Sequence, residues 1–329
     1  MTHKERSLNL RHKSFERFFL ERDLSLIDEF LKDNHFISYL SDNLLLLKFH
    51  KIIDQSNHEI DNQLSSIIAG EKLRVRGMED RIISISKYMN ENNINHIFTK
   101  AFQHYPDMGH DIDLLLEGSF ESYDLKEKLL LQRDKTSFLN KIAEKKPFVT
   151  KENIAIEFHR FVGHFGEYKT LTNLFFELKT DLNGISILSR ENQLILQLIQ
   201  RFYSHFSVRF SDILLCIDLV NSDLDFDYIK NTSEKNDLKY PLEIFLNFLV
   251  ENYSPYITND FLKTDTRNPK LYPKYSDNLY RYKKIFTIKL YLKKIFSALM
   301  RHDLFALKKL LYIPIVFIST EFKYFKKGK

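Results

Sequence analysis

The sequence predicts an α+β protein, with a small mixed β-sheet core flanked by N-terminal helices and a C-terminal helical domain. Its composition is that of an ordinary folded chain, with 43% hydrophobic and 28% charged residues. Glycine (8) and proline (7) are scarce, which disfavours turn-rich all-β folds and glycine-rich nucleotide loops. Apolar residues repeat at helical spacing near both ends of the chain, and at strand spacing only in between.

The domain organisation follows from length and from these changes in apolar period. A chain of 329 residues can hold one large domain or two ordinary ones. We expect an N-terminal helical region (1–75), an α/β core (76–185) and a C-terminal helical domain with a basic tail (186–329).

The N-terminal elements come first. Helices are expected across 13–70, and a separate helix over 77–92, which the Asn92-Asn93 pair ends. The apolar period then changes. Segment 94–100 is short and rich in β-branched and aromatic residues, and segment 110–117 alternates before it becomes wholly apolar. Both are therefore predicted to be strands, adjacent to each other.

The rest of the chain is predicted to contain one more strand and otherwise helices. Residues 125–135 are predicted to be helical. The segment 153–160 alternates, with Glu157 and His159 on one face, and is predicted to be a third strand. Beyond residue 189 we expect a long connection over 254–282 and helices over 194–199, 213–220, 242–250 and 285–311.

Several classes of protein are disfavoured. Cys216 is the only cysteine, so the chain has no internal disulfide and no thiolate zinc site, which fits a reducing, cytoplasmic compartment. Residues 1–12 are polar and basic, unlike a secretory signal. No stretch reaches the roughly 18 to 20 apolar residues of a transmembrane helix. The apolar segment 310–320 contains Pro314 and is expected to be buried or interfacial.

Positive charge is concentrated at the C-terminal end. The net charge is +5, but 239–329 contains 18 Lys or Arg against 7 Asp or Glu. Within 280–309, lysine pairs alternate with Tyr, Phe and Ile, a pattern that suits stacking on nucleic acid or contact with an anionic membrane over 280–329. The alternative is a helix that packs its apolar side on the protein and exposes its lysines to water.

Asp111 and Asp113 are the sharpest chemical feature. Because side chains alternate along a strand, both carboxylates point to the same face. Two close anions repel, and a divalent metal relieves that repulsion. Glu157, on the third strand, would complete a three-carboxylate site of the kind that holds two ions for an in-line displacement. The alternative is a solvated strand face or the edge of a loop.

These segments resemble a known family. Lys100, the Tyr105-Pro106 pair, Asp111 to Leu115 (DIDLL) and Glu157 to His159 (EFH) are similar to successive motifs of the uncharacterised nucleotidyltransferase family in the polymerase β-type superfamily. Segments 192–194 and 203–212 resemble the helical region of that family.

The resemblance implies roles for individual residues. Asp111 and Asp113 would hold a pair of Mg²⁺ or Mn²⁺ ions, Glu157 would be the third carboxylate, and Lys100 would approach the triphosphate. Ala101 stands where the family has glycine, and its Cβ limits how closely the backbone can approach phosphate. Arg160 is a candidate phosphate contact, with a surface ion pair as its alternative role.

The expected function is therefore metal-dependent transfer of a nucleoside monophosphate from an NTP to an acceptor, with release of pyrophosphate. The acceptor, whether small molecule, glycan, protein or nucleic acid, is left open. The alternative is a catalytically inactive module that binds nucleotide, nucleic acid or an anionic membrane surface through its basic C-terminal half. A histidine metal site is disfavoured because no His-x-x-x-His pair stands on a helix beside a glutamate. Serine-nucleophile and P-loop motifs are missing.

Overall fold

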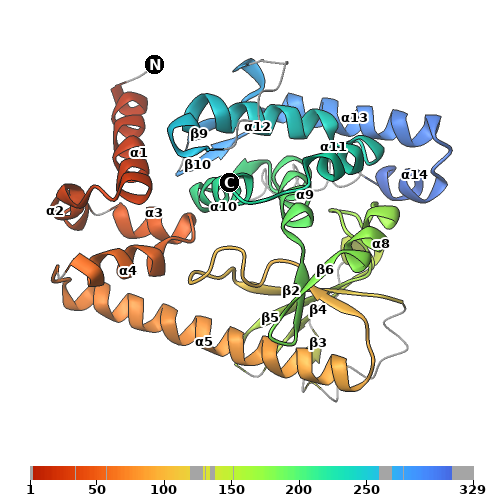
Figure 1. The fold of residues 1–329 in the computed structure, drawn as a ribbon, viewed down its shortest axis with the longest axis horizontal. Helices are drawn as coiled ribbons and strands as arrows, with labels where there is room; N and C mark the ends of the chain where they lie inside the picture. The colour runs from red at the N-terminus through yellow and green to blue at the C-terminus, as the bar shows by residue number, and fades with distance from the viewer. Residues whose placement is uncertain are drawn as a thin grey trace, which may run out of the picture.

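The computed structural model describes residues 3–33, 35–56, 58–118, 129, 131–133, 138–150, 152–258, 269–276 and 278–312. The fold is α+β, as predicted. Figure 1 shows short helices at one end, a sheet with one long helix running along it, and a layer of helices above the sheet. Among the described residues, no helix is long and apolar enough to cross a membrane.

The N-terminal helices pack around phenylalanines. Phe15 and Phe30 have ring centroids 4.7 Å apart, as do Phe36 and Phe49. Aromatic pairs at this distance bury large apolar areas and fix the relative positions of short helices. The elements are α1 (His3–Glu21), a 3-10 turn (Leu24–Leu26), α2 (Ile27–Leu31), α3 (Phe36–Asp42) and α4 (Leu46–Ser56).

Helix α5 (Asn62–Glu91) is continuous, so the prediction of a separate helix over 77–92 was wrong. The Asp61 side chain caps it by accepting a hydrogen bond from the Leu64 N–H, at 2.7 Å. Gly70 and Gly77 lie inside the helix, where a single glycine costs only about 1 kcal/mol. The buried residues from Leu64 to Met89 compensate for that cost. The expected boundary after residue 75 falls within this helix.

One mixed sheet of the described residues has the strand order β3-β4-β5-β2-β1-β7-β6. The three predicted strands are confirmed as β1 (His96–Phe98), β2 (Asp111–Leu116) and β5 (Ala155–His159). As expected, β1 pairs with β2, in antiparallel register. The strands not predicted are β3 (Gln132–Arg133), β4 (Lys145–Val149), β6 (Lys179–Leu182) and β7 (Ile185–Leu188).

The structure differs from the predicted core at two places, the helix expected over 125–135 and the boundary after residue 185. Gln132 and Arg133 form β3, not part of a helix over 125–135, because they pair with Val149 and Phe148 of β4. The rest of that expected helix, apart from residues 129 and 131, lies outside the described residues. The expected boundary after residue 185 falls within β7, so the sheet extends to residue 188.

The C-terminal part is mostly helical, as expected. It follows α7 (Phe138–Ile142) and α8 (Lys169–Glu177). Its first helix, α9 (Arg190–Ile199), continues directly into one π-helical turn (Gln200–Ser204). The helices after α8 are α9 (Arg190–Ile199), α10 (Phe210–Val220), α11 (Phe226–Lys235), α12 (Lys239–Tyr253), α13 (Lys284–Met300) and α14 (Leu304–Leu310).

The C-terminal part differs from the prediction in the connection over 254–282 and in the helix expected over 285–311. The connection over 254–282 contains 3-10 turns (Ser254–Tyr256, Pro269–Leu271) and two short strands, β9 (Lys274–Ser276) and β10 (Leu279–Arg281). They form a small antiparallel sheet with β8 (Ser207–Val208). The helix expected over 285–311 is broken between α13 and α14, where Asp303 caps α14 through the Ala306 N–H. Of the apolar segment 310–320, Leu310 is buried, and 313–320 lies outside the described residues.

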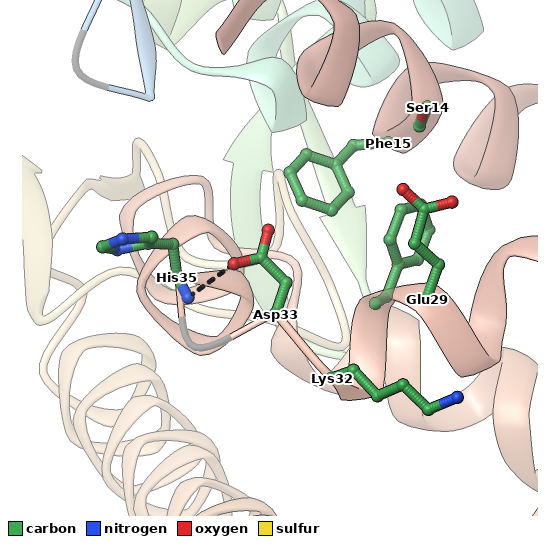
Figure 2. Close-up of a pocket in the computed structure, with 7 residues that line it drawn as sticks. Ser14, Phe15, Glu29, Lys32, Asp33 and His35 are labelled. Carbon is green, nitrogen blue, oxygen red and sulfur yellow. Dashed lines mark hydrogen bonds between the residues drawn. The ribbon is translucent and has the colours of Figure 1, made fainter. Parts of the chain in front are cut away.

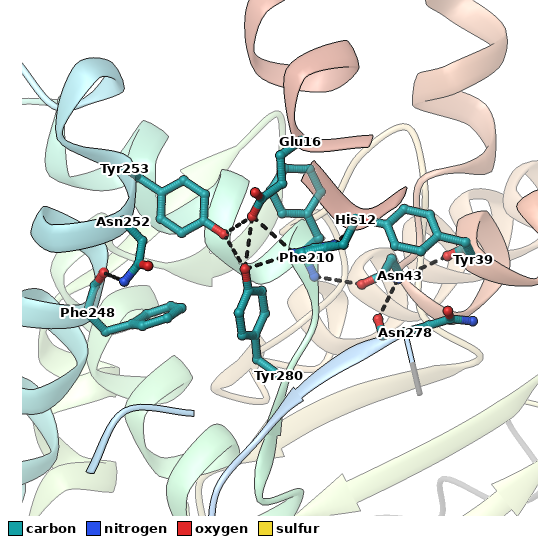
Figure 3. Close-up of polar contacts among 10 residues, drawn as sticks. All are labelled: His12, Glu16, Tyr39, Asn43, Phe210, Phe248, Asn252, Tyr253, Asn278 and Tyr280. Carbon is teal, nitrogen blue, oxygen red and sulfur yellow. Dashed lines mark hydrogen bonds and ion pairs between the residues drawn. The ribbon is translucent and has the colours of Figure 1, made fainter. Parts of the chain in front are cut away.

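A buried asparagine joins three parts of the fold (Figure 3). Asn43 is fully buried. Its Nδ2 donates to the Tyr39 carbonyl at 3.0 Å and to the Asn278 carbonyl at 2.9 Å, and its Oδ1 accepts from the Phe210 N–H at 2.7 Å. One side chain therefore ties α3 to the turn between β9 and β10 and to the N-terminus of α10.

We expect Asn43→Ala to lower the free energy of unfolding by about 1–3 kcal/mol, because it leaves the buried Phe210 N–H without its partner and breaks the bond to the Asn278 carbonyl. Urea unfolding followed by circular dichroism measures this loss. Asn252→Ala is the control, since Asn252 is exposed and bonds only within α12, to the Phe248 carbonyl. Equal losses in the two variants would contradict the assignment of Asn43 as a structural tie.

Candidate active site

The three predicted carboxylates lie on one face of two neighbouring strands. β2 and β5 are parallel, with Asp113 directly opposite Glu157 and Asp111 opposite Ala155. Side chains two residues apart on a strand share a face, so Asp111 and Asp113 point the same way as Glu157. The alternate residues, including Ile112 and Phe158, are fully buried on the opposite face.

The loop that precedes Asp111 is held from two sides. The buried Asp107 carboxylate accepts hydrogen bonds from the backbone N–H groups of Leu47 and Lys48 at 2.8 and 2.9 Å, which caps the start of α4. The Arg74 guanidinium, on α5, donates to the carbonyls of Met108 and Gly109, both at 2.7 Å. Asp111 therefore begins its strand directly after a fixed segment of backbone.

A cavity of 320 Å³ opens over this face of the sheet. It lies between the strands and the α9 helix with its π-helical turn. The sheet side contributes the three carboxylates with Lys100, Lys145 and His159, and the helical side contributes Gln200, Ser204 and His205. A concave site with several convergent charged groups is the usual form of a small-molecule site.

Two lysines and one histidine neutralise two of the carboxylates. Lys100 forms an ion pair with Asp113, whose side chain is 1% exposed, and Lys145 forms one with Glu157. His159 lies between them, with Nε2 2.9 Å from Asp113 Oδ1 and 3.6 Å from Glu157 Oε2. For Asp111, in contrast, the described residues provide no hydrogen bond or ion pair.

The pKa values of the three carboxylates reflect the difference between the paired Asp113 and Glu157 and the unpaired Asp111. Burial acts to raise the pKa of Asp113, but Lys100 and His159 outweigh it and hold the pKa well below its usual value. The pKa of Glu157 is lowered in the same way by His159 and Lys145. The pKa of Asp111 is raised, by burial and by the charge of Asp113. The charge of Asp111 is thus the least compensated of the three, because burial and Asp113 outweigh the attraction of Lys100 and Lys145.

The donor atoms that lie close enough together for one divalent cation come from Asp113, Glu157 and His159, and Asp111 is not among them. One donor atom each from Asp113, Glu157 and His159 all lie within 4.8 Å of one another. Carboxylate oxygens are the ligands of Mg²⁺, and Mn²⁺ binds the same oxygens. The ammonium groups of Lys100 and Lys145 contact the same carboxylates, so a cation at this place would compete with them.

Two of the predicted site residues do not line the cavity. Ala101 is buried in the hydrophobic core, with 6% exposure. Arg160 forms an ion pair with Glu144 at 2.8 Å, which is the alternative role considered for it. Lys100 does line the cavity, beside the carboxylates.

Several lining residues were not predicted. His159 was placed on the same strand face as Glu157 by the alternating pattern, but it was given no role in the site. Lys145 had no such signal, since β4 is short and contains Pro147. The contribution of Ser204 and His205 depends on how the α9 helix packs over the sheet, which a local pattern does not contain.

Behind the cavity lies a buried polar network. Asp212 is fully buried, and its Oδ1 is 2.9 Å from Arg201 Nη2 and 3.1 Å from His104 Nε2. Arg201 also donates to Gln197 Oε1 at 3.1 Å, and Gln197 in turn donates to Gln103 at 2.9 Å. The network connects the loop before β2 with α9 and α10, and so fixes the sheet side of the cavity relative to its helical side.

A second cavity, of 440 Å³, lies among the N-terminal helices (Figure 2). It is lined by residues of α1, α2 and the turn before α3, and the Asp33 carboxylate there accepts a hydrogen bond from the His35 N–H at 3.0 Å. None of the predicted site residues lines it. We therefore place the candidate active site at the three carboxylates.

No family model matches the chain, and no curated protein or solved structure matches it either.

Proposed function

We propose that the chain is a metal-dependent nucleotidyltransferase of the cytoplasm, which moves a nucleoside monophosphate from an NTP to an acceptor. One observation carries the proposal. Asp111, Asp113 and Glu157 come from two parallel strands in a register that places them on one face, at the floor of a cavity that also holds two lysines. A set of clustered carboxylates with adjacent cations is what in-line phosphoryl chemistry requires.

The metal would be Mg²⁺ or Mn²⁺, held by Asp111, Asp113 and Glu157. When bound, it would supply charge neutralisation for the attacking and leaving oxygens. In the reaction, the acceptor oxygen forms a bond to the α-phosphorus, the bond to pyrophosphate breaks, and the acceptor loses its proton to a base.

The protein's own residues have separate tasks in this proposal. Lys100 and Lys145 exchange their carboxylate partners for phosphate oxygens, which ammonium groups bind as point charges. His159 holds Asp113 and Glu157 in position through Nε2. The Gln200 and Ser204 side chains, on the opposite wall, offer hydrogen bonds to a base or an acceptor.

Isothermal titration of each NTP, with and without Mg²⁺, tests the proposal. We expect the wild-type chain to bind an NTP only with the metal, and the Asp111→Ala, Asp113→Ala double variant to lose this binding. Glu117→Gln is the matched control, because Glu117 follows the same strand but bonds to Asn95 outside the cavity. NTP binding that survives in the double variant would contradict the carboxylate site.

A second candidate function is a catalytically inactive module that binds nucleotide. It is favoured by Ala101, whose Cβ stands where the family motif has glycine, and by the two lysines that already neutralise Asp113 and Glu157. Pyrophosphate release separates the two functions. Metal-dependent NTP binding without pyrophosphate release, across acceptors of all four classes, would favour the inactive module.

A further inference from the structure

The C-terminal helices α13 and α14 expose several large apolar side chains. We call this set the apolar row. Of the exposed large hydrophobic residues in the part of the chain that the structure describes, more than half belong to it, with exposed fractions between 44% and 75%. Its members are Ile288, Leu292, Phe296, Leu299, Met300, Leu304 and Leu311. Exposed apolar side chains that gather on one face mark a site of interaction.

The rotation of α13 is fixed by its other face. Tyr291 donates a hydrogen bond from its hydroxyl to the Tyr203 carbonyl, and Lys294 forms a buried ion pair with Glu167 at 2.5 Å. Ile288, Leu292 and Phe296 are spaced four residues apart, so they lie along one side of the helix. The apolar row therefore faces outward because the inner face of α13 is already occupied.

The charges that α13 and α14 themselves carry are almost entirely positive. Of the acids that lie beside α13, Asp237 pairs with Arg301 and Glu234 with Lys239. Lys283, Lys289, Lys293 and Lys308 are exposed beside the apolar row. From 283 to 309 the sequence contains one acidic residue, Asp303, and its carboxylate is used to cap α14. In Figure 1, α13 and α14 lie in the helical layer, on the far side of the molecule from α5.

We propose that this face docks on an anionic lipid surface, with the apolar row in the interfacial region and the lysines against the headgroups. An amphipathic helix with an apolar face and flanking lysines binds anionic membranes in two ways. Its apolar face is buried in the interfacial region, and its lysines are attracted to the anionic headgroups. A second copy of the chain is a poorer occupant, because two faces with the same positive charge repel each other. None of the residues that line the candidate active site belongs to α13 or α14, so docking leaves that cavity open.

Leu292→Trp tests the proposal, because the chain contains no tryptophan and the new side chain is the sole indole reporter. We expect its emission to be that of a water-exposed indole in the lipid-free protein. With phosphatidylcholine vesicles that contain phosphatidylserine, it should shift to the blue and be quenched by brominated lipid. Leu73→Trp is the matched control, since Leu73 is 74% exposed on α5, and its emission should not change.

Flotation with the same vesicles gives a second measurement. The full chain should float with the mixed vesicles and much less with pure phosphatidylcholine. Each lysine of the face changed to glutamine should weaken binding by about fivefold, and Leu292→Ser with Phe296→Ser should abolish flotation. A blue emission at position 292 without lipid would show that the row is already covered, by 313–329 or by a second copy, and would overturn the proposal. Failure of the wild-type chain to float would also overturn it.

Discussion

Asp212→Asn is expected to lower the free energy of unfolding by about 3–5 kcal/mol, because it leaves the buried Arg201 without its anionic partner. Asp212 is fully buried and Arg201 is 6% exposed, so neither charge is solvated by water. The carboxylate also accepts a hydrogen bond from the Arg209 N–H at 2.7 Å, at the start of α10. The amide of asparagine keeps the shape but not the charge.

The pH dependence of this loss follows from the pKa of Asp212. Burial acts to raise that pKa, but Arg201 and His104 outweigh it and lower it well below its usual value. A lowered pKa stabilises the fold above the unfolded value of about 3.9, and this contribution disappears as the pH falls through the folded value. The difference between wild type and Asp212→Asn should therefore be constant near neutral pH and shrink below about pH 4.

Chemical unfolding at several pH values measures both effects. Asp218→Asn is the matched control, because Asp218 is on the same helix and exposed. The free energy of unfolding of Asp218→Asn should stay within about 0.5 kcal/mol of the wild-type value. If Asp212→Asn were as mild as this control, the buried network could not be what holds the sheet side of the cavity to its helical side.

The sequence allowed the sheet residues of the candidate site to be predicted because a period of two assigns each residue to a face. Asp111 and Asp113 share a face for that reason, and Glu157 joins them because β5 pairs with β2. The pairing of β2 with β5 could not be predicted, because strands far apart in the chain find their register through tertiary packing. The same limit applies to His205, which reaches the cavity only because α9 lies over the sheet.

The errors in the predicted elements have local causes. Gly77 suggested the start of a helix, yet α5 runs through it because the buried stripe is continuous on both sides. β9 and β10 are three residues long, too short for an alternating pattern to stand out. Lys145 was missed with its strand, although it neutralises Glu157. Helical and strand periods thus located the main elements, and short segments depended on contacts that the pattern does not record.

Asp111→Asn is expected to reduce nucleotidyl transfer by about a thousandfold while leaving the fold as stable as before or more stable. The activity loss follows if Asp111 holds the metal, which contributes several kcal/mol of transition-state stabilisation. The stability gain follows from the structure, because Asp111 has no hydrogen bond or ion pair with the described residues. Its burial and the repulsion by Asp113 also outweigh the attraction of Lys100 and Lys145. Removing an unpaired charge that serves function commonly stabilises a protein, by about 1 kcal/mol.

Asp113→Asn gives the contrast that makes this prediction specific. Asp113 is buried and holds both Lys100 and His159, so its variant should lose stability together with activity. Pyrophosphate release and urea unfolding, measured on both variants, separate the two cases. If Asp111→Asn were fully active, Asp111 would not be a metal ligand. If it were inactive but also strongly destabilised, its carboxylate would have a structural partner, and the loss of activity would say nothing about catalysis.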